Sequence, residues 1–462
     1  MKNLTLLLYL ISYCTLAQNL NTLKIRTEDH LTALQPSLFN ISETVWNYSE
    51  PSFMEYRTSK LFKTVLLKEG FTIEENIGGY STMFIASFGN KGPAIGILAE
   101  ADADNPLNPI KQLDLPNSDF GHGAGHHLLG TGSLGAALVL KKLVENGKID
   151  AQIKFFFSSG EGNLGGRVPM VKKGCFDDVD LAFFWHPAPV TSASLSKWDA
   201  LIDLELTYAG ANALKNAMTI IDYVEQLKKE HGSNAILRAK IQNTVYNLAI
   251  PDDSIKLQLR IEHPKQAKAI SIYNGIIEHL ENQKRHGHVE WKVFRALHEF
   301  IPSLIGNELA YHYISGLEKR KVTPKDEELA NLIYQLASKE KGSFLTDPLP
   351  FKKERSDGPY GYASDIADVS WKVPLISFVI SCLPSGLSMR NWEAAAFGNS
   401  EYAQEAIIHA IKTITFTTLD YLSNSTVRKN IKLEFDSRKN GRRYFEEIEI
   451  HDIPASRNKR SF

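Results

Sequence analysis

Short apolar runs that alternate with helix-like segments constrain the fold of this chain most strongly. Three runs have the composition of buried strands, at residues 94–99, 152–157 and 181–185. The segment 128–145 between them is rich in leucine and alanine, and the segment 168–173 is closed by Gly174, as helices are. Strands of this kind alternating with helices predict an α/β layer built on a parallel or mixed sheet.

The middle of the chain has a different pattern. Residues 201–208 and 255–262 alternate between apolar and polar, and the helix-like segments 211–229 and 266–282 follow them. Strands with one buried face predict a small α+β unit, with its helices on one side of its sheet. We expect the pattern to return to mixed α/β around Trp291. A strand at 375–379 and a long helix at 401–422 then belong to the first layer.

Composition and charge exclude few functions but favour some. The chain has 462 residues, 43% of them hydrophobic, and a formal net charge of -1, which suits two globular domains. This near-neutral charge gives no electrostatic reason to expect a nucleic-acid or membrane-surface partner. The two cysteines outside the first 17 residues, Cys175 and Cys382, do not make a disulfide framework, and we expect buried thiols.

The two ends of the chain differ from the rest. Lys2, an apolar run at 4–13 and small residues up to Ala17 predict a cleavable signal peptide, and therefore a secreted or periplasmic protein. A lipoprotein would carry its lipid on Cys14, but the bulky Tyr13 disfavours this interpretation. No later run reaches the length of a transmembrane helix. Residues 426–462 are polar and without periodicity, so we expect a loosely ordered tail.

Three segments combine histidines and carboxylates at the predicted ends of strands. They are Glu100-Ala-Asp102 with the histidine-rich turn at 121–127, the glycine-rich loop at 158–166, and Phe184-Trp-His186-Pro187. In α/β sheets the loops that carry function gather at the carboxyl ends of the strands. Imidazole and carboxylate groups are ligands that zinc prefers. The sequence therefore predicts a site, with a metal as one hypothesis, at this edge of the sheet.

These segments resemble the zinc aminoacylase/carboxypeptidase superfamily, and most closely its branch of aminobenzoyl-glutamate hydrolases and auxin-conjugate amidohydrolases. The motifs that carry the resemblance are Ala99-Glu-Ala-Asp102-Ala, the helix at 129–138, Gly174-Cys-Phe-Asp-Asp-Val-Asp180 and Trp185-His-Pro187. The resemblance extends over about residues 52–422. It implies a mixed-sheet α/β catalytic domain with an inserted α+β dimerisation domain, and amide hydrolysis as the ancestral chemistry.

The resemblance also implies a division of the chain. The signal peptide would cover residues 1–17. The catalytic-type domain would consist of residues 18–195 and 293–425, and the inserted dimerisation domain of residues 196–292. The polar carboxyl-terminal tail would cover residues 426–462. A homodimer is compatible with this division.

In the family, two metal ions activate a water that attacks an amide carbonyl. The resemblance implies that His126 and His186 are retained metal ligands and that Glu161 is the general base. Three ligand positions carry residues that bind no metal, namely Ala124, Gly162 and Leu387. The loop that carries an oxyanion-binding histidine in the family is shortened at residues 208–214. Asp102, His122 and His127 could assist a rebuilt site, and Ser364 and Asp365 are candidate residues of the cleft.

Three hypotheses follow for the chemistry. In the first, His126, His186 and Glu161 hold one zinc ion with water as its fourth ligand, and the protein hydrolyses N-acyl amino acids, aminoacyl conjugates or short peptides. In the second, the protein is a pseudo-hydrolase that binds a peptide, an amino-acid conjugate or a protein partner. The third, catalysis without a metal, is weaker, because no Gly-x-Ser-x-Gly elbow accompanies the serines of the loops.

Overall fold

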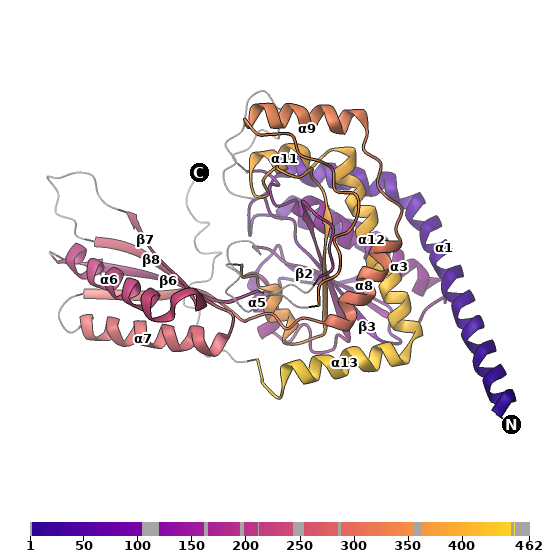
Figure 1. Ribbon diagram of the computed structural model, residues 1–462, viewed down its shortest axis with the longest axis horizontal. Coiled ribbons are helices and arrows are strands. Elements are labelled where there is room, and N and C mark those ends of the chain that lie inside the picture. The colour runs from indigo at the N-terminus through magenta and orange to yellow at the C-terminus, as the bar shows by residue number, and fades with distance from the viewer. Residues whose placement is uncertain are drawn as a thin grey trace.

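A computed structural model gives the fold of the chain. It describes residues 2–103, 120–160, 165–194, 198–210, 212–243, 254–284, 288–353, 362–444 and 448. Side chains are described from Leu20 onward within these ranges, except for that of Asn243. Two sheets organise the described chain, one in a larger domain and one in a smaller domain that lies to its side (Figure 1).

The larger domain is built on a six-stranded mixed sheet with the order β1-β2-β4-β3-β5-β10. The strands β4, β3, β5 and β10 are parallel, and β1 and β2 form an antiparallel edge. The strand bounds are β1 Thr72–Glu75, β2 Phe84–Phe88, β3 Ala94–Ala99, β4 Gln152–Phe157, β5 Leu181–Ala188 and β10 Leu375–Ser381. Because β3, β4 and β5 are parallel neighbours, their carboxyl ends meet at one edge of the sheet.

Helices enclose this sheet. Helix α3 packs on β3, β4 and β5, and α12 and α1 pack on α3 in turn. Two glycines of α3 allow this close packing: a Cβ on Gly132 would lie 2.6 Å from the Trp185 ring, and one on Gly135 would lie 2.4 Å from Ile411. The helices of this domain are α1 Lys2–Tyr48, α2 Tyr56–Lys68, α3 His126–Glu145, α5 Arg167–Lys172, α8 Leu304–Gly316, α9 Pro324–Leu336, α10 Ile366–Ser370, α11 Trp392–Phe397, α12 Glu401–Ser423 and α13 Ser425–Lys439.

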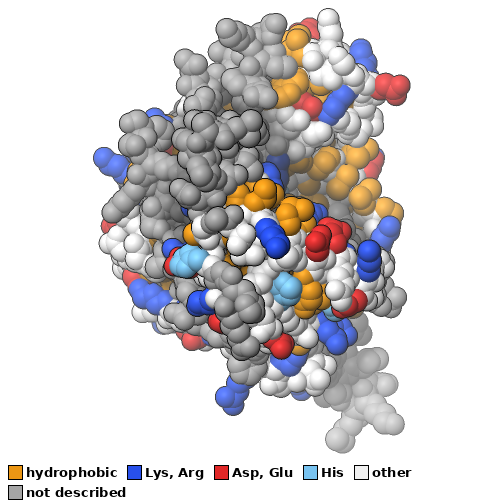
Figure 2. Space-filling view, turned by 90° about the vertical axis from the view of Figure 1, so that its left-hand side faces the viewer, with side chains coloured by type: hydrophobic (Ala, Val, Ile, Leu, Met, Phe, Trp, Pro, Cys, Tyr) orange, Lys and Arg blue, Asp and Glu red, His pale blue; other side chains and the backbone are white. Residues whose placement is uncertain are grey.

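The smaller domain has a four-stranded antiparallel sheet with the order β7-β8-β6-β9 and its own hydrophobic core. The strands are β6 Ala200–Ala209, β7 Ile236–Asn243, β8 Ser254–His263 and β9 His288–Leu297, and the helices α6 Ala213–His231 and α7 Gln266–Lys284 pack on this sheet. Figure 2 views the molecule from this end and shows hydrophobic side chains lying among charged ones. Helix α6 contributes the exposed side chains of Leu214 and Met218.

The predicted fold class, an α/β domain on a mixed sheet with an inserted α+β unit, is confirmed. The strands expected at 94–99 and 152–157 have those bounds. The return to the first pattern around Trp291 was wrong, because Trp291 lies in β9, which pairs with β6. The smaller sheet therefore continues to Leu297, beyond the boundary expected at residue 292.

The expectation of a loosely ordered tail from residue 426 was also wrong for residues 426–439. They form α13, which packs against α8 and α12. Its contact with the core rests on two buried side chains, Ile431 and Phe435. Glu434 accepts hydrogen bonds from the backbone N–H groups of Leu304 and Ile305, both at 2.9 Å, at the start of α8. The helix is held by these few contacts, which are too sparse to give a visible apolar period.

The amino-terminal segment forms α1, and its second half packs into the core of the larger domain through Leu31, Leu38, Ile41 and Val45. The signal peptide predicted for residues 1–17 stays a prediction. Among the described residues, no helix has the length and apolar character needed to cross a membrane.

Candidate metal centre

Three buried or nearly buried side chains meet at the carboxyl ends of β3 and β5. Glu100 directly follows β3, His186 lies near the end of β5, and His126 is the first residue of α3. Each offers one potential ligand atom, and these atoms all lie within 4.8 Å of one another. The cluster therefore forms because two parallel strands end beside the start of a helix.

The distances between the donor atoms suit a single tetrahedral metal ion. Nε2 of His126 lies 3.3 Å from Nε2 of His186 and 3.4 Å from Oε1 of Glu100. Ligand atoms placed about 2.0–2.1 Å from one tetrahedral zinc ion lie about 3.3–3.4 Å from each other. Two imidazole nitrogens and one carboxylate oxygen form a zinc ligand set that leaves a fourth position open. The residues present therefore fit the metal that the fold suggests.

Hydrogen bonds to the other ring nitrogens direct both Nε2 atoms toward the centre of this cluster. Nδ1 of His126 lies 2.8 Å from Oδ1 of Asp102, and Nδ1 of His186 lies 2.6 Å from the carbonyl oxygen of Pro187. A carbonyl oxygen can only accept, so Nδ1 of His186 carries the hydrogen and Nε2 has the lone pair. A carboxylate on Nδ1 of His126 does the same, as in the carboxylate–histidine pairs of many metal sites.

Asp102 is ionised in this setting. Burial by itself would raise its pKa, but the neighbouring His126 and hydrogen bonds from His126 and Ser52 bring the pKa of Asp102 down to about 2. Ser52 donates its hydroxyl hydrogen to Oδ2 of Asp102 at 2.5 Å. Nearby, burial and the charge of Asp102 raise the pKa of Glu55 well above its usual range, which favours the protonated form. One carboxylate is thus charged to orient His126, while its neighbour is held neutral.

Glu100 is held on its far side by a buried arginine. The guanidinium of Arg167 donates to Oε2 of Glu100 and, at 2.8 Å, to Oδ1 of Asp365. All three side chains are at most 1% exposed. Glu100 therefore presents one oxygen to the two histidines and the other to the guanidinium.

His122 and His127 lie apart from this cluster and contact the backbone of other segments. Nε2 of His122 hydrogen-bonds the carbonyl of Val45 at 3.0 Å, and Nε2 of His127 that of Gly398 at 2.9 Å. Burial lowers the pKa of His122 to about 4, so this ring is neutral near pH 7. These two histidines join α3 to α1 and to the segment before α12, which is a structural role.

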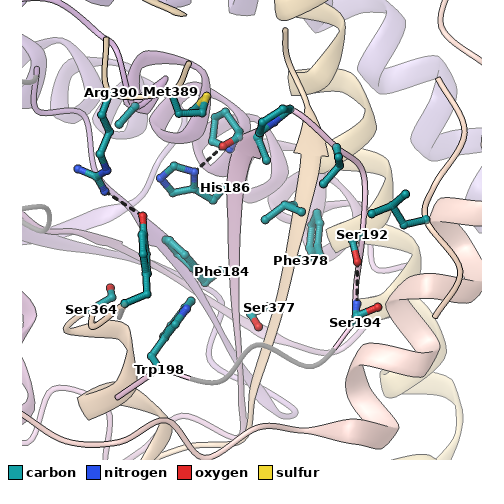
Figure 3. A pocket seen from close by; sticks show the side chains of 18 residues that line it. Phe184, His186, Ser192, Ser194, Trp198, Ser364, Ser377, Phe378, Met389 and Arg390 are labelled. Carbon is teal, nitrogen blue, oxygen red and sulfur yellow. Dashed lines mark hydrogen bonds between the residues drawn. The ribbon is translucent and has the colours of Figure 1, made fainter. Parts of the chain in front are cut away.

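A pocket of about 490 Å³ opens beside His186 (Figure 3). Its walls are mainly apolar and include Phe184, Trp198 and Phe378, while Ala124 and Ser364 also line it. Arg390 stands at one side and donates a hydrogen bond to the hydroxyl of Tyr362 at 3.3 Å. The site thus combines a candidate metal position with an apolar recess and one exposed cation.

The structure separates the residues proposed from the sequence. His126 and His186 meet, Asp102 supports His126, Ser364 lines the pocket, and Asp365 is buried against Arg167. Leu387 is a buried residue of the core, and Ala124 lines the pocket. Glu161 and Gly162 lie outside the described residues.

Sequence reasoning assigned no role to Glu100, Arg167 or Arg390. The signal that could have identified Glu100 was its place directly after a buried strand, within the motif Ala99-Glu-Ala-Asp102. No comparable local signal marks Arg167, because its partners Glu100 and Asp365 are distant in the sequence.

Comparisons with known proteins agree with this fold and site. No family model matches the chain. A subunit of the p-aminobenzoyl-glutamate hydrolase of Escherichia coli is 24% identical over 453 residues, covering 88% of this chain and 93% of that protein. A dinuclear metal-binding peptidase of the M20 family from Bacillus subtilis superposes with a TM-score of 0.56 at 17% identity, covering 85% of this chain and 99% of that one. An aminobenzoyl-glutamate utilization protein from Klebsiella pneumoniae superposes with a TM-score of 0.59 at 13% identity, covering 86% and 99%.

The fold and the cluster at the ends of β3 and β5 define an amidohydrolase-like protein with the fold of M20 peptidases. More particularly, the chain is a homologue of the p-aminobenzoyl-glutamate hydrolase of Escherichia coli.

Proposed function

We propose that this protein hydrolyses an amide bond in small amino-acid conjugates, with one zinc ion held by Glu100, His126 and His186. The observation that carries the proposal is the spacing of the three donor atoms, together with the hydrogen bonds that point both Nε2 atoms at a common centre. A divalent ion held there supplies Lewis-acid polarisation of an amide carbonyl and activates water for attack.

The pocket supports a conjugate with an apolar part and a carboxylate. Phe184, Trp198 and Phe378 offer surfaces on which an acyl or aromatic group packs. Arg390 offers a guanidinium that suits a carboxylate of the substrate. The name of the Escherichia coli relative describes such a substrate, in which an aminobenzoyl group is joined to glutamate. N-acyl amino acids and short peptides have the same two parts.

Proton transfer is proposed to rest on Glu161, in the loop that follows β4. The carboxyl end of β4 lies beside that of β3, which is followed by Glu100. A Glu161→Gln variant keeps the size of the side chain and removes its basicity. We expect it to retain metal and substrate binding and to lose activity by about a hundred-fold or more.

Two further parts of the proposal concern assembly and location. The edge strands β7 and β9 of the smaller sheet are the surfaces through which we expect two chains to pair. The Escherichia coli relative is named as one subunit of its hydrolase, which supports an oligomer. A cleavable signal peptide at residues 1–17 would direct the protein out of the cytoplasm.

The metal content of the purified chain tests the proposal. The protein is dialysed against trace zinc and the metal per chain is counted by mass spectrometry, with His126→Ala and His186→Ala beside it. The exposed His288→Ala is the matched control, because the side chain of His288 is 63% exposed. About one zinc per chain, lost in the two site variants only, supports the proposal and directs the substrate screen to acyl-amino acids and dipeptides.

A chain that binds no zinc, manganese, nickel or cobalt above background would overturn the metallohydrolase proposal. The protein would then be a pseudo-hydrolase whose pocket binds a peptide or conjugate. Binding of N-acyl amino acids by the metal-free chain, measured by calorimetry, distinguishes this outcome from a loss of all function.

A further inference from the structure

Arg167 is the cation nearest to the carboxylate of the candidate metal centre. It is the first residue of α5, and Asp365 directly precedes α10, which packs on α5. Besides its guanidinium contacts with Glu100 and Asp365, the backbone N–H of Arg167 donates to Oδ2 of Asp365 at 2.7 Å. Asp365 therefore fixes both the start of α5 and the direction of the Arg167 side chain.

The two oxygens of Glu100 have separate partners. Oε1 lies 3.4 Å from Nε2 of His126, on the side of the metal ligands, and Oε2 accepts from the guanidinium of Arg167. A carboxylate that bridges two metal ions would need both oxygens. We propose that the Arg167 guanidinium takes the place of a second metal ion and restricts this site to a single divalent cation. This inference rests on the proposed metal site.

The charges of the described residues point to the same stoichiometry. Glu100, Asp102 and Asp365 are buried carboxylates, and Arg167 is the buried cation that contacts two of them. Taken as ionised, these four groups have a formal charge of -2, which one divalent ion neutralises. A second divalent ion would leave excess positive charge in a buried setting, next to a guanidinium, and this is costly.

The planar guanidinium is suited to this position. It presents several N–H donors in a fixed fork, so one side chain serves two carboxylates at once. A lysine would keep the charge without the fork. The proposed role of Arg167 is therefore that of a positioning residue, which acts on the metal through Glu100.

Zinc stoichiometry and affinity in three variants test the inference. Arg167→Met removes the cation and leaves Glu100 and Asp365 facing a vacated position, Arg167→Lys keeps a cation, and the Arg167→Met/Asp365→Asn double variant removes both charges. Zinc per chain is measured by mass spectrometry, and the zinc Kd by competition with a chelator. We expect about one ion in the wild type and in Arg167→Lys, and about two in Arg167→Met.

The double variant keeps the test decisive if Arg167→Met does not fold, because it leaves no unpaired charge at Asp365. It is expected to bind about one zinc ion with an affinity at least ten-fold weaker, since Glu100 has lost its support. Two ions in the wild type would overturn the inference. So would an unchanged zinc affinity in the double variant, or one ion with unchanged affinity in folded Arg167→Met.

These outcomes separate the inference from the proposed function. A wild-type chain without metal removes the metal centre and the proposed function with it. A wild-type chain with one zinc ion and variants that behave like it removes only the role of Arg167.

Discussion

Oδ1 of Asp102 lies 2.8 Å from Nδ1 of His126, and this contact fixes which nitrogen of the ring faces Glu100 and His186. Removing such a supporting carboxylate typically weakens metal binding by about 10- to 100-fold. We therefore expect Asp102→Ala to raise the zinc Kd by that factor, with a smaller effect for Asp102→Asn, which keeps an acceptor oxygen. Chelator competition measures both, and Asp347→Asn, at an exposed position, is the control. An unchanged Kd in Asp102→Ala would mean that His126 needs no such support.

Arg390 is expected to determine the preference for substrates that carry a carboxylate. A hydrogen bond to a charged group contributes about 1.5–3 kcal/mol, so Arg390→Ala should raise KM about ten-fold or more with kcat nearly unchanged. Arg390→Lys should recover part of the loss. The measurement compares an N-acyl amino acid with its carboxamide, because the carboxamide lacks the group that Arg390 would bind. Equal losses for the two substrates would contradict this role.

His409 predicts a pH dependence of stability. Burial, followed by the charges of Arg320 and Lys412, lowers the pKa of His409 to about 3. An unfolded chain would bind a proton at this ring near pH 6.5, so the native state loses stability as the pH falls from about 6.5 toward 3. From pH 7 to pH 5 the loss that is due to His409 is roughly 2 kcal/mol.

Urea unfolding at pH 7 and pH 5 measures this effect in the wild type and in His409→Gln. The variant should lose less stability than the wild type over this interval. His288→Gln, at an exposed position, should follow the wild type. Identical pH dependence in wild type and His409→Gln would show that another group controls the acid lability.

The contact of α13 with α8 is expected to contribute to stability. Glu434 accepts from the N–H groups of Leu304 and Ile305, where the positive end of the α8 dipole favours a negative charge. Glu434→Ala should lower the free energy of unfolding by about 1–2 kcal/mol. Asn430→Ala, at an exposed position on the same helix, is the control. Equal urea midpoints for the two variants would show that this contact contributes little.

Gly132 is expected to be required for the packing of α3 on β5. A Cβ there would lie 2.6 Å from the buried Trp185 ring, whose indole N–H donates to the carbonyl of Leu129. Gly132→Ala should therefore destabilise the protein by about 1–3 kcal/mol through overpacking. Gly316→Ala is the control, because the structure shows no atom within 4 Å of a Cβ at that position. A Gly132→Ala variant as stable as Gly316→Ala would contradict the close packing.

Local patterns in the sequence were sufficient for the elements of the two sheets. The strands at 94–99 and 152–157 are uninterrupted apolar runs because both of their faces are buried, and such runs need no tertiary information to be recognised. Helix α13 was missed for the opposite reason, since Ile431 and Phe435 are its buried residues and the rest is polar. Trp291 was misplaced because an edge strand resembles the start of a new layer when its pairing with β6 is unknown.

The sequence by itself determined the layered α/β architecture, the inserted α+β unit and the two histidines of the candidate site. These features depend on periodicity and on short motifs, which are local. Only the tertiary structure placed Glu100 beside His126 and His186, and Arg167 between Glu100 and Asp365. Arg167 and Asp365 are separated by 198 positions in the chain, and β3 and β5 place Glu100 and His186 at one edge of the sheet. The direction of each side chain at that edge follows from strand order and helix packing, which no local sequence pattern specifies.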